Sequence, residues 1–310
     1  TADGSAGIGN GGNGIEITDG ASNTIGGATA GHRNVISGNG TGEAGVFISG
    51  ATSSGNVIQL NYVGTNKDGD AAIPNNLHGV WIDNAPNTQV LDNLISGNDV
   101  HGVYVYDIGS TGTQILRNTI GTNAAHTAPI PNLFDGVRLE GNSSGTTVGS
   151  AGNGNVVGGN AQHGVNINSS DANTIQANFV GTDSTGTVDL GNTWAGVYSD
   201  VFNSSSNLIG GDSLSGEGNT IALNAEGVRL ESGTNNAIVG NNIYSNDSLG
   251  IDLNDDGVTN NDGGDGDPGP NDLLNFPVIT SASAIASTVT VDFGLDVPAG
   301  DYRIEFFDNT

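Results

Sequence analysis

Cysteine and methionine are absent from this 310-residue chain, and lysine and arginine together number only 6. Without cysteine, the protein can form neither a disulfide framework nor a thiolate metal site. The formal net charge is −27, with 33 Asp and Glu residues. Such a charge excludes nucleic acid as a natural partner. It also disfavours anionic membranes, and acidic polysaccharides unless cations bridge the two.

Long apolar runs are lacking as well. No segment approaches the about 20 apolar residues that a membrane-spanning helix needs, so we expect no membrane insertion. The first residues, TADGSAGIGN, contain neither the basic nor the apolar region of a secretion signal. The excess of acidic residues is compatible with a salty or calcium-rich environment. We therefore expect an extracellular or cell-surface protein from which any signal has been removed.

Glycine, in contrast, is abundant, with 52 residues interleaved with regularly spaced Val, Ile and Leu. This pattern is typical of a turn-rich all-β fold. A Gly-Val-x-Ile motif recurs at intervals of 23 to 34 residues. Its opening glycines are Gly14, Gly45, Gly79, Gly102, Gly136, Gly164, Gly196, Gly227 and Gly250. A unit of this length is too short for a four-stranded propeller blade, and it lacks the helical half of a leucine-rich repeat.

Each unit contains three short apolar segments separated by Asn, Gly, Ser or Asp, for example at residues 80–82, 90 and 94–95. Three short strands per unit, with turn residues between them, are typical of one coil of a parallel β-solenoid. The sequence therefore predicts an all-β parallel β-helix of about eight to nine three-stranded coils. Nine stacked strands at the usual spacing of about 4.8 Å would give a rod about 40 Å long.

Asparagine marks the third apolar segment of nearly every unit. These residues are Asn34, Asn61, Asn93, Asn118, Asn155, Asn178, Asn219 and Asn242. An amide side chain offers two donors and an acceptor with two lone pairs, so stacked asparagines can bond to one another along a ladder. We expect such a structural ladder, and regard ligand binding by these amides as the less favoured alternative.

If Val and Ile of each motif face the core, the residues between and after them point outward. The first outward row reads Glu16, Phe47, Trp81, Tyr104, Arg138, Asn166, Tyr198, Arg229 and Asp252. The second outward row reads Thr18, Ser49, Asp83, Tyr106, Glu140, Asn168, Asp200, Glu231 and Asn254. The residues directly before the glycine in four consecutive coils are His78, His101, Asp135 and His163. Scarce aromatic, histidine and arginine residues are thus concentrated on one face.

This face has three possible uses. If the chain is an enzyme, acid–base chemistry would fall to His101, Tyr104, Asp135, Arg138, Glu140 and His163. If it binds glycans, the binding residues would be Trp81, Tyr104, Tyr106, Arg138, Tyr198 and Arg229. A structural alternative remains, because Arg138 with Glu140, and Arg229 with Glu231, can pair across a solvated sheet.

An acidic segment at residues 252–272 follows the last repeat. Its spacing partly resembles an EF-hand loop, although Gly263 occupies the position of the final acid and flanking helices are missing. The predicted ligands are Asp252, Asn254, Asp256, the carbonyl of Val258, Asn260 and Asp262. Because crowded carboxylates repel one another unless a hard cation intervenes, we expect bound Ca²⁺ that stiffens this segment.

Residues 276–310 depart from the repeat. Two alternating runs, at residues 288–293 and 302–306, flank the turn VPAG and are similar to the first strands of an immunoglobulin-like sandwich. They are too few to complete one. Either the chain continues in the natural protein, or the strands pack on the rod, or a neighbouring subunit completes them by strand addition, which would permit self-association.

With these repeats, residues 1–253 resemble the right-handed parallel β-helix proteins of the pectate-lyase-like superfamily. They resemble more closely the glycine- and asparagine-rich β-helix segments of large bacterial surface proteins. We divide the chain accordingly into a β-helix at 1–253, an Asp/Gly-rich calcium-binding linker at 254–275 and partial immunoglobulin-like strands at 276–310. The superfamily includes lyases, hydrolases, epimerases, tailspikes, adhesins and inert stalks, so the resemblance alone does not define an activity.

Catalytic signatures of well-known members of the superfamily are missing. The sequence contains neither the acidic set of the polygalacturonases nor the Asp-Pro-His-Asp motif of the mannuronan epimerases. We therefore expect a non-catalytic scaffold, adhesin, stalk or filament subunit that associates with polysaccharide or with neighbouring subunits. The alternatives are a carbohydrate-active enzyme, such as a lyase, hydrolase or epimerase, and a glycan-binding module that uses the outward face of the Gly-Val-x-Ile sheet.

Overall fold

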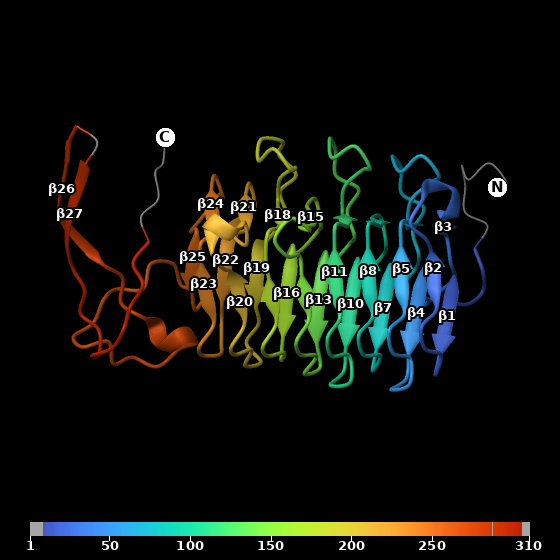
Figure 1. Cartoon of the computed structure of the whole chain (residues 1–310), viewed down its shortest axis with the longest axis horizontal. Helices are drawn as coiled ribbons and strands as arrows, with labels where there is room; N and C mark the ends of the chain where they lie inside the picture. The colour runs from blue at the N-terminus through green and yellow to red at the C-terminus, as the bar shows by residue number, and fades with distance from the viewer. Residues whose placement is uncertain (1–8, 287, 306–310) are drawn as a thin grey trace.

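The computed structural model describes residues 9–286 and 288–305, and there the chain winds into a right-handed parallel β-helix (Figure 1). Within these residues it forms three parallel sheets of nine, eight and eight strands. The first sheet comprises β1 (Ile15–Thr18), β4 (Val46–Ser49), β7 (Val80–Asp83), β10 (Val103–Tyr106), β13 (Val137–Glu140), β16 (Val165–Asn168), β19 (Ala195–Ser199), β22 (Glu226–Leu230) and β25 (Ile251–Leu253). The second comprises β2 (Thr24–Gly26), β5 (Val57–Gln59), β8 (Gln89–Leu91), β11 (Gln114–Leu116), β14 (Thr147–Val148), β17 (Thr174–Ile175), β20 (Leu208–Gly210) and β23 (Ala237–Val239). The third comprises β3 (Val35–Ile36), β6 (Tyr62–Val63), β9 (Leu94–Ile95), β12 (Thr119–Ile120), β15 (Val156–Val157), β18 (Phe179–Val180), β21 (Thr220–Ala222) and β24 (Asn242–Tyr244).

The strands of the first sheet follow from the alternation of apolar and outward-facing residues in each Gly-Val-x-Ile motif. In β7, Val80 and Ile82 are fully buried, whereas Trp81 between them is only half-buried. Equivalent residues stack in register, as Val80 does beside Val103 of β10. The inward side chains of all three sheets form one continuous apolar core along the rod. The predicted parallel β-helix is thus confirmed.

The glycine that opens each motif, except Gly250 in the last one, is required by close packing between coils. A Cβ atom on Gly102 would lie 2.6 Å from the carbonyl oxygen of Gly136 and 2.8 Å from Cγ2 of Ile120. Both distances are far below van der Waals contact, so only glycine fits at this corner of the coil.

The asparagines of the third sheet form a buried ladder, as predicted. The Asn118 amide donates to Oδ1 of Asn155 at 3.0 Å, and its own Oδ1 accepts from the Asn93 amide at 3.1 Å. The last predicted member is wrong. Asn219 donates to Asn241, because Asn242 begins β24 with its side chain exposed.

A second asparagine ladder follows the third sheet, at the corner before the first sheet of the next coil. Its members are Asn39, Asn75, Asn98, Asn132, Asn160, Asn192, Asn224 and Asn246. Each side chain connects one coil to the next, so the turns of the rod are tied together through its interior.

Three long insertions leave the rod between the third sheet and the first sheet and project from the same side (Figure 1). They share an antiparallel bridge near their base: Thr65 with Ala72, Thr122 with Pro129, and Thr182 with Asp189. Shorter corners carry the 3₁₀ turns η1 (Ala30–His32) and η2 (Ser213–Ser215). Insertions at fixed corners leave the stacked core undisturbed.

Beyond β25 the chain folds back against the end of the rod. The turn η3 (Pro270–Leu273) carries Asn271, whose amide donates to the carbonyl of Asn236 at 2.7 Å and whose Oδ1 accepts from the Asn236 backbone N–H at 2.9 Å. Glu305 accepts a hydrogen bond from the backbone of Gly240 at 2.8 Å. Segments before and after the hairpin therefore contact the last coils directly.

An antiparallel hairpin of β26 (Val278–Ile285) and β27 (Thr288–Gly294) stands away from the rod (Figure 1). Every residue of β26 is exposed, so the hairpin does not pack on the β-helix. The strand predicted at 302–306 is wrong for residues 302–305, which are irregular because Glu305 bonds to the rod instead of to β27. Phe306 lies outside the described residues.

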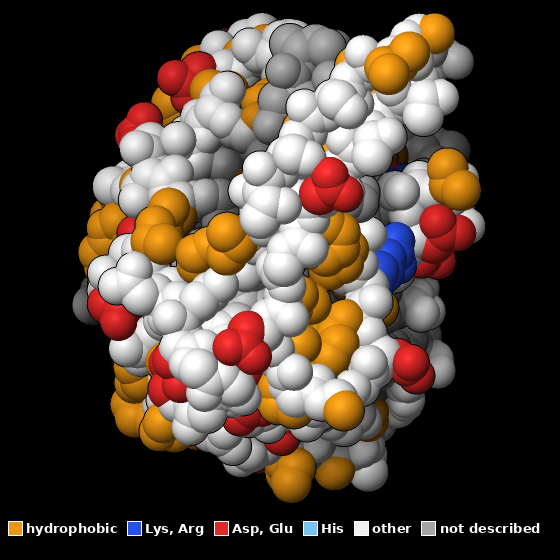
Figure 2. Space-filling model, turned by 90° about the vertical axis from the view of Figure 1, so that its left-hand side faces the viewer, with side chains coloured by type: hydrophobic (Ala, Val, Ile, Leu, Met, Phe, Trp, Pro, Cys, Tyr) orange, Lys and Arg blue, Asp and Glu red, His pale blue; other side chains and the backbone are white. Residues whose placement is uncertain are grey.

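Seen from the end that carries the hairpin, the surface shows hydrophobic side chains among acidic ones, and acids outnumber basic groups in view (Figure 2). This agrees with the large excess of Asp and Glu in the sequence. In the part of the chain that the structure describes, no helix has the length and apolarity needed to cross a membrane.

Candidate functional site

The first outward row is continuous in register, although Asn166, Tyr198 and Asp252 are buried. Its members pair strand by strand from Glu16 on β1 to Asp252 on β25. The members of the second outward row pair strand by strand as far as Asn168 of β16. The next member, Asp200, lies beyond the end of β19, whose last residue is the buried Ser199. The predicted aromatic and arginine residues are therefore aligned along the rod.

Four aromatic side chains lie next to one another on this face, and we refer to them as the aromatic platform. The ring centroids of Phe47 and Trp81 are 4.5 Å apart, those of Trp81 and Tyr104 6.1 Å, and those of Tyr104 and Tyr106 5.6 Å. Such distances are usual for aromatic pairs and stabilise the arrangement. Tyr106 is the most exposed of the four, at 38%. The platform provides flat, amphipathic faces of the kind on which sugar rings stack.

Arg138 follows Tyr104 in the row and is the centre of a charged group. Its Nε donates to Oε2 of Glu140 at 2.7 Å, and its Nη1 donates to Oδ2 of Asp135 at 3.3 Å. The Tyr104 hydroxyl donates to the same Glu140 oxygen at 3.0 Å. His101 Nδ1 lies 3.3 Å from Oδ2 of Asp135 and accepts the Asp135 backbone N–H at 3.2 Å. These five residues form the Arg138 cluster.

Burial controls the ionisation of this cluster. Asp135 is fully buried, which raises the pKa of its carboxyl to about 6, although the Arg138 charge opposes the shift. Burial lowers the pKa of His101 to about 2, with His78 and Arg138 acting in the same direction. Burial, together with the charge of Glu140, raises the pKa of the Tyr104 hydroxyl. At neutral pH the histidine is neutral and the arginine faces two acidic side chains.

The four residues that precede the glycines do not gather at one point. His78 stacks on His101, with ring centroids 5.2 Å apart, and burial lowers the pKa of His78 to about 3. His163 stacks on Tyr198 instead, at 4.2 Å, and burial lowers its pKa to about 3. Only the backbone N–H of His163 reaches Asp135 in a hydrogen bond, at 3.2 Å. All residues of the predicted catalytic set therefore contact one another in the Arg138 cluster, except for the imidazole ring of His163.

Tyr198 and Arg229, the remaining predicted glycan-binding residues, lie further along the same row. The guanidinium carbon of Arg229 is 4.6 Å from the centroid of the Tyr198 ring. Arg229 contacts three acids, Glu226, Glu231 and Asp255, and we refer to these five residues as the Arg229 cluster. The predicted glycan-binding residues thus fall into two groups on one face.

Two aromatic residues that sequence reasoning did not select also border this face. Phe134 lies edge-on to His101, with ring centroids 5.6 Å apart, and Trp194 lies edge-on to His163 at 5.1 Å. Both are well exposed, at 40% and 46%. Their signal in the sequence is a shared position, because each stands at the end of an insertion, two residues before a repeat glycine.

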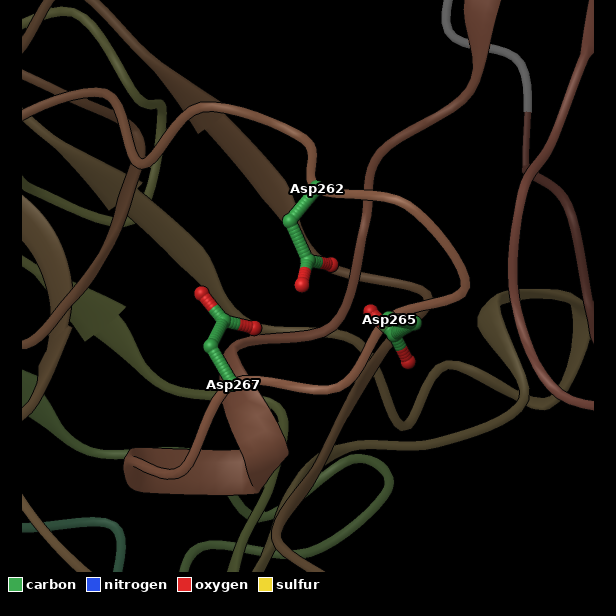
Figure 3. Close-up of side chains that lie close together, drawn as sticks. All are labelled: Asp262, Asp265 and Asp267. Carbon is green, nitrogen blue, oxygen red and sulfur yellow. The ribbon is translucent and has the colours of Figure 1, made fainter.

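The acidic segment brings together a ligand set different from the predicted one. Carboxylate oxygens of Asp262, Asp265 and Asp267 lie within 4.8 Å of one another in the loop before η3 (Figure 3). Among the described residues, no other group of three or more acidic, histidine or cysteine side chains could hold one ion. Only Asp262 belongs to the EF-hand-like set. Asp252 is buried beside Arg229, while the other members, Asn254, Asp256, Val258 and Asn260, are exposed.

The aromatic platform and the Arg138 cluster together place stacking faces beside hydrogen-bond donors and acceptors. This combination is typical of sites that bind polar ligands with extended apolar faces. In addition, the Asp135 carboxyl group has a pKa of about 6, so it gains or loses its proton close to neutral pH. A group that transfers protons near neutral pH needs such a pKa.

No family model and no curated protein matches the sequence. Among solved structures, the chain is similar to a double mutant of the periplasmic alginate epimerase AlgG, with a TM-score of 0.52 and 17% identity over 77% of this chain and 47% of that one. It is also similar to the A-module of the Azotobacter vinelandii mannuronan C-5 epimerase AlgE4, with a TM-score of 0.47 and 16% identity over 66% and 50% of the two chains. The chain thus spans about half the length of these structures. The chain is a parallel β-helix protein, as its resemblance to the pectate-lyase-like superfamily implies.

The preference for a non-catalytic scaffold is corrected by this comparison. The first of these two structures, which shares the fold at a TM-score above 0.5, is an alginate epimerase, a carbohydrate-active enzyme, and no finding supports an adhesin or a filament. The fold is thus shared with an enzyme, and the scaffold interpretation is not retained. The preference arose from a missing family motif, and such an absence excludes one arrangement of catalytic residues but not carbohydrate recognition by the same sheet.

Proposed function

We propose that this chain is a carbohydrate-active protein that binds a polysaccharide along the first outward row. One observation carries the proposal: the aromatic platform runs directly into the Arg138 cluster, with Tyr104 and Arg138 paired on neighbouring strands. A sugar ring has apolar faces and a polar rim. It would stack on the platform while its hydroxyl groups bond to the charged side chains beside it.

The charge of the protein bears on the kind of polysaccharide. Arg138 already faces Asp135 and Glu140, and the whole chain carries a net charge of −27. An uncharged polysaccharide therefore meets no electrostatic barrier, whereas an acidic one would need bridging cations. Because the chain is similar in fold to an enzyme named for alginate, acidic polysaccharides are included in the binding test below.

A reaction on the bound chain is the second candidate function, and the buried Asp135 favours it. Its raised pKa, about 6, would let it hold or release a proton near neutral pH, and His101 and Arg138 lie within 3.3 Å of its carboxyl. Tyr104 and Glu140 are partly exposed above it and would face the sugar. The chemistry that these groups can supply is proton transfer to or from a sugar unit, as in cleavage or epimerisation.

We further propose that the protein works outside the cytoplasm and holds structural Ca²⁺ in its acidic segment. The shared fold with a periplasmic enzyme is compatible with such a location. The close approach of Asp262, Asp265 and Asp267 supports an oxygen-only site of the type that Ca²⁺ prefers.

The test combines binding and turnover. The full chain is incubated with neutral and acidic polysaccharides, including alginate, with and without millimolar Ca²⁺. Binding is followed by affinity electrophoresis, cleavage by chromatography, and epimerisation by proton NMR. We expect retardation by at least one polymer, and loss of it in Trp81→Ala. If proton transfer occurs, Tyr104→Phe and Asp135→Asn should abolish turnover while binding persists.

The control variant is Arg117→Ala, which removes an exposed arginine that directly follows β11 of the second sheet and pairs with Asp92, away from the outward rows. It should behave like the wild-type chain, whereas Arg138→Ala should weaken binding. Equal loss in both arginine variants, or no binding of any polymer, would refute the proposed site.

A further inference from the structure

The Arg138 cluster has a counterpart on the same sheet. The segment DGVRLE at 135–140 recurs as EGVRLE at 226–231, so each arginine has an acid three residues before it and another two residues after it. Each arginine also pairs in register with a tyrosine of the preceding strand, Arg138 with Tyr104 and Arg229 with Tyr198. The chain therefore builds the same chemical arrangement twice on one face.

The geometry of the second arrangement is close to that of the first. Arg229 Nη1 lies 3.4 Å from Oε2 of Glu226, and its Nε lies 3.2 Å from Oε1 of Glu231. The corresponding distances for Arg138 are 3.3 Å to Asp135 and 2.7 Å to Glu140. Both arginine side chains are mostly covered, with 16% and 18% of their surface exposed.

The Arg229 cluster borders a hollow. The hollow, of about 280 Å³, is lined by Trp194, Ala225, Glu226 and Arg229. Its volume is close to the lower end of the about 300–1,000 Å³ of typical small-molecule sites. Glu226 lines the hollow, and its carboxylate can accept a hydrogen bond from a ligand hydroxyl group. Trp194 contributes an exposed indole at the rim.

The spacing of the two clusters follows from the fold. Arg138 and Arg229 are separated by three strand-to-strand steps, from β13 through β16 and β19 to β22. At about 4.8 Å a step, they lie about 14 Å apart along the rod. The two tyrosines are offset by the same three steps. One extended chain lying over this face would therefore meet both clusters in the same relative orientation, passing above the buried Asn166 and Tyr198.

The charges restrict what the hollow can bind. Arg229 already contacts the carboxylates of Glu226, Glu231 and Asp255. A uronate would bring a fourth carboxylate to one guanidinium, and repulsion among the like charges would oppose it. Hydroxyl groups, in contrast, can donate hydrogen bonds to these carboxylates.

We propose that the hollow beside Trp194 and Arg229 is a second carbohydrate subsite, which takes an uncharged, hydroxyl-bearing sugar unit of the same chain that binds at the aromatic platform. This inference rests on the proposed function, because it assumes that the platform binds a polysaccharide. A chain long enough to reach both subsites gains affinity without any new kind of contact, since the second unit binds at a high effective concentration.

The experiment measures affinity against ligand length by isothermal titration calorimetry of the full chain. The probes are length series of cello-, manno- and xylo-oligosaccharides, with oligomannuronates as the acidic series. In the wild-type chain we expect affinity for one neutral series to rise about tenfold or more once the oligomer spans about 14 Å. Trp194→Ala should abolish this rise and leave the affinity for shorter oligomers unchanged, and Trp194→Phe should retain it.

The matched control is Phe202→Ala, which removes an exposed aromatic residue that does not line the hollow. Circular dichroism melting establishes that each variant is folded. A rise that persists in Trp194→Ala, no rise in the wild-type chain, or a rise confined to oligomannuronates overturns the second subsite but leaves the proposed function standing. Absence of binding to any oligomer overturns both.

Discussion

Asn75 in the second asparagine ladder offers a direct test of how the coils are held together. It is fully buried, whereas the next residue, Asn76, is exposed. Asn75 Oδ1 accepts from the backbone N–H and the side-chain amide of Asn39, at 3.3 and 2.7 Å. Its own amide donates to Oδ1 of Asn98 at 2.9 Å and to the carbonyl of Ile36 at 3.0 Å. The substitution Asn75→Ala removes all four bonds at once.

The expected cost follows from the groups left behind. Two donors of Asn39 and the acceptor of Asn98 would remain buried without these partners, and each such group costs about 1–3 kcal/mol. We therefore expect Asn75→Ala to lower the free energy of unfolding by at least about 3 kcal/mol. Asn76→Ala removes only exposed bonds, to Gly42 and Asp99, and should change it by less than about 0.5 kcal/mol.

Urea denaturation followed by far-ultraviolet circular dichroism measures the difference. The slope of the transition must stay the same in both variants, so that the midpoints report stability alone. Similar midpoints for the two variants would refute the view that the buried amide ladder stabilises the stack.

Three further predictions concern packing, pH and metal. Gly102→Ala should lower the melting temperature through a loss of about 1–3 kcal/mol, since its Cβ would lie 2.6 Å from the Gly136 oxygen, whereas Gly12→Ala meets no atom within 4 Å and should be neutral. Burial lowers the pKa of His163 to about 3, so its stabilising contribution is present above the unfolded value of 6.5 and is lost as the pH falls. His163→Gln should therefore flatten the fall in stability between about pH 6 and pH 4 by about 1.4 kcal/mol per pH unit, and an unchanged slope in denaturation titrations would contradict this. Ca²⁺ at about 100 times its Kd should stabilise the wild-type chain by about 2.7 kcal/mol in calorimetry, and an equal gain in Asp265→Asn would argue against the proposed metal site.

In a solenoid, the repeat pattern predicts which residues of the candidate site lie on adjacent strands. The sequence predicts Trp81, Tyr104 and Arg138 as neighbours because each occupies the same position in its motif. Coils stack in register, so residues at the same motif position lie on adjacent strands. Trp194 was not selected, because its contact with His163 depends on the path of an insertion that does not obey the repeat.

The acidic segment shows the opposite case. A linear spacing rule selected Asp252 and Asp256 as ligands, but Asp252 is also a member of the first outward row and lies buried beside Arg229, whereas Asp256 is exposed. The loop beyond it returns so that Asp262, Asp265 and Asp267 approach one another. Without a repeat or a regular strand, the spacing of residues says little about which side chains meet.

The sequence by itself determined the coil, the inward apolar residues, the register of the first outward row and the second row as far as Asn168, because strand alternation is local and the repeat transfers it from coil to coil. Only the tertiary structure decided that Asp135 and His101 are buried, that Asn241 ends the first ladder, and that a hollow opens beside Trp194. Burial and cavities depend on how insertions and chain ends cover the rod. Those contacts join residues far apart in sequence, which no local periodicity encodes.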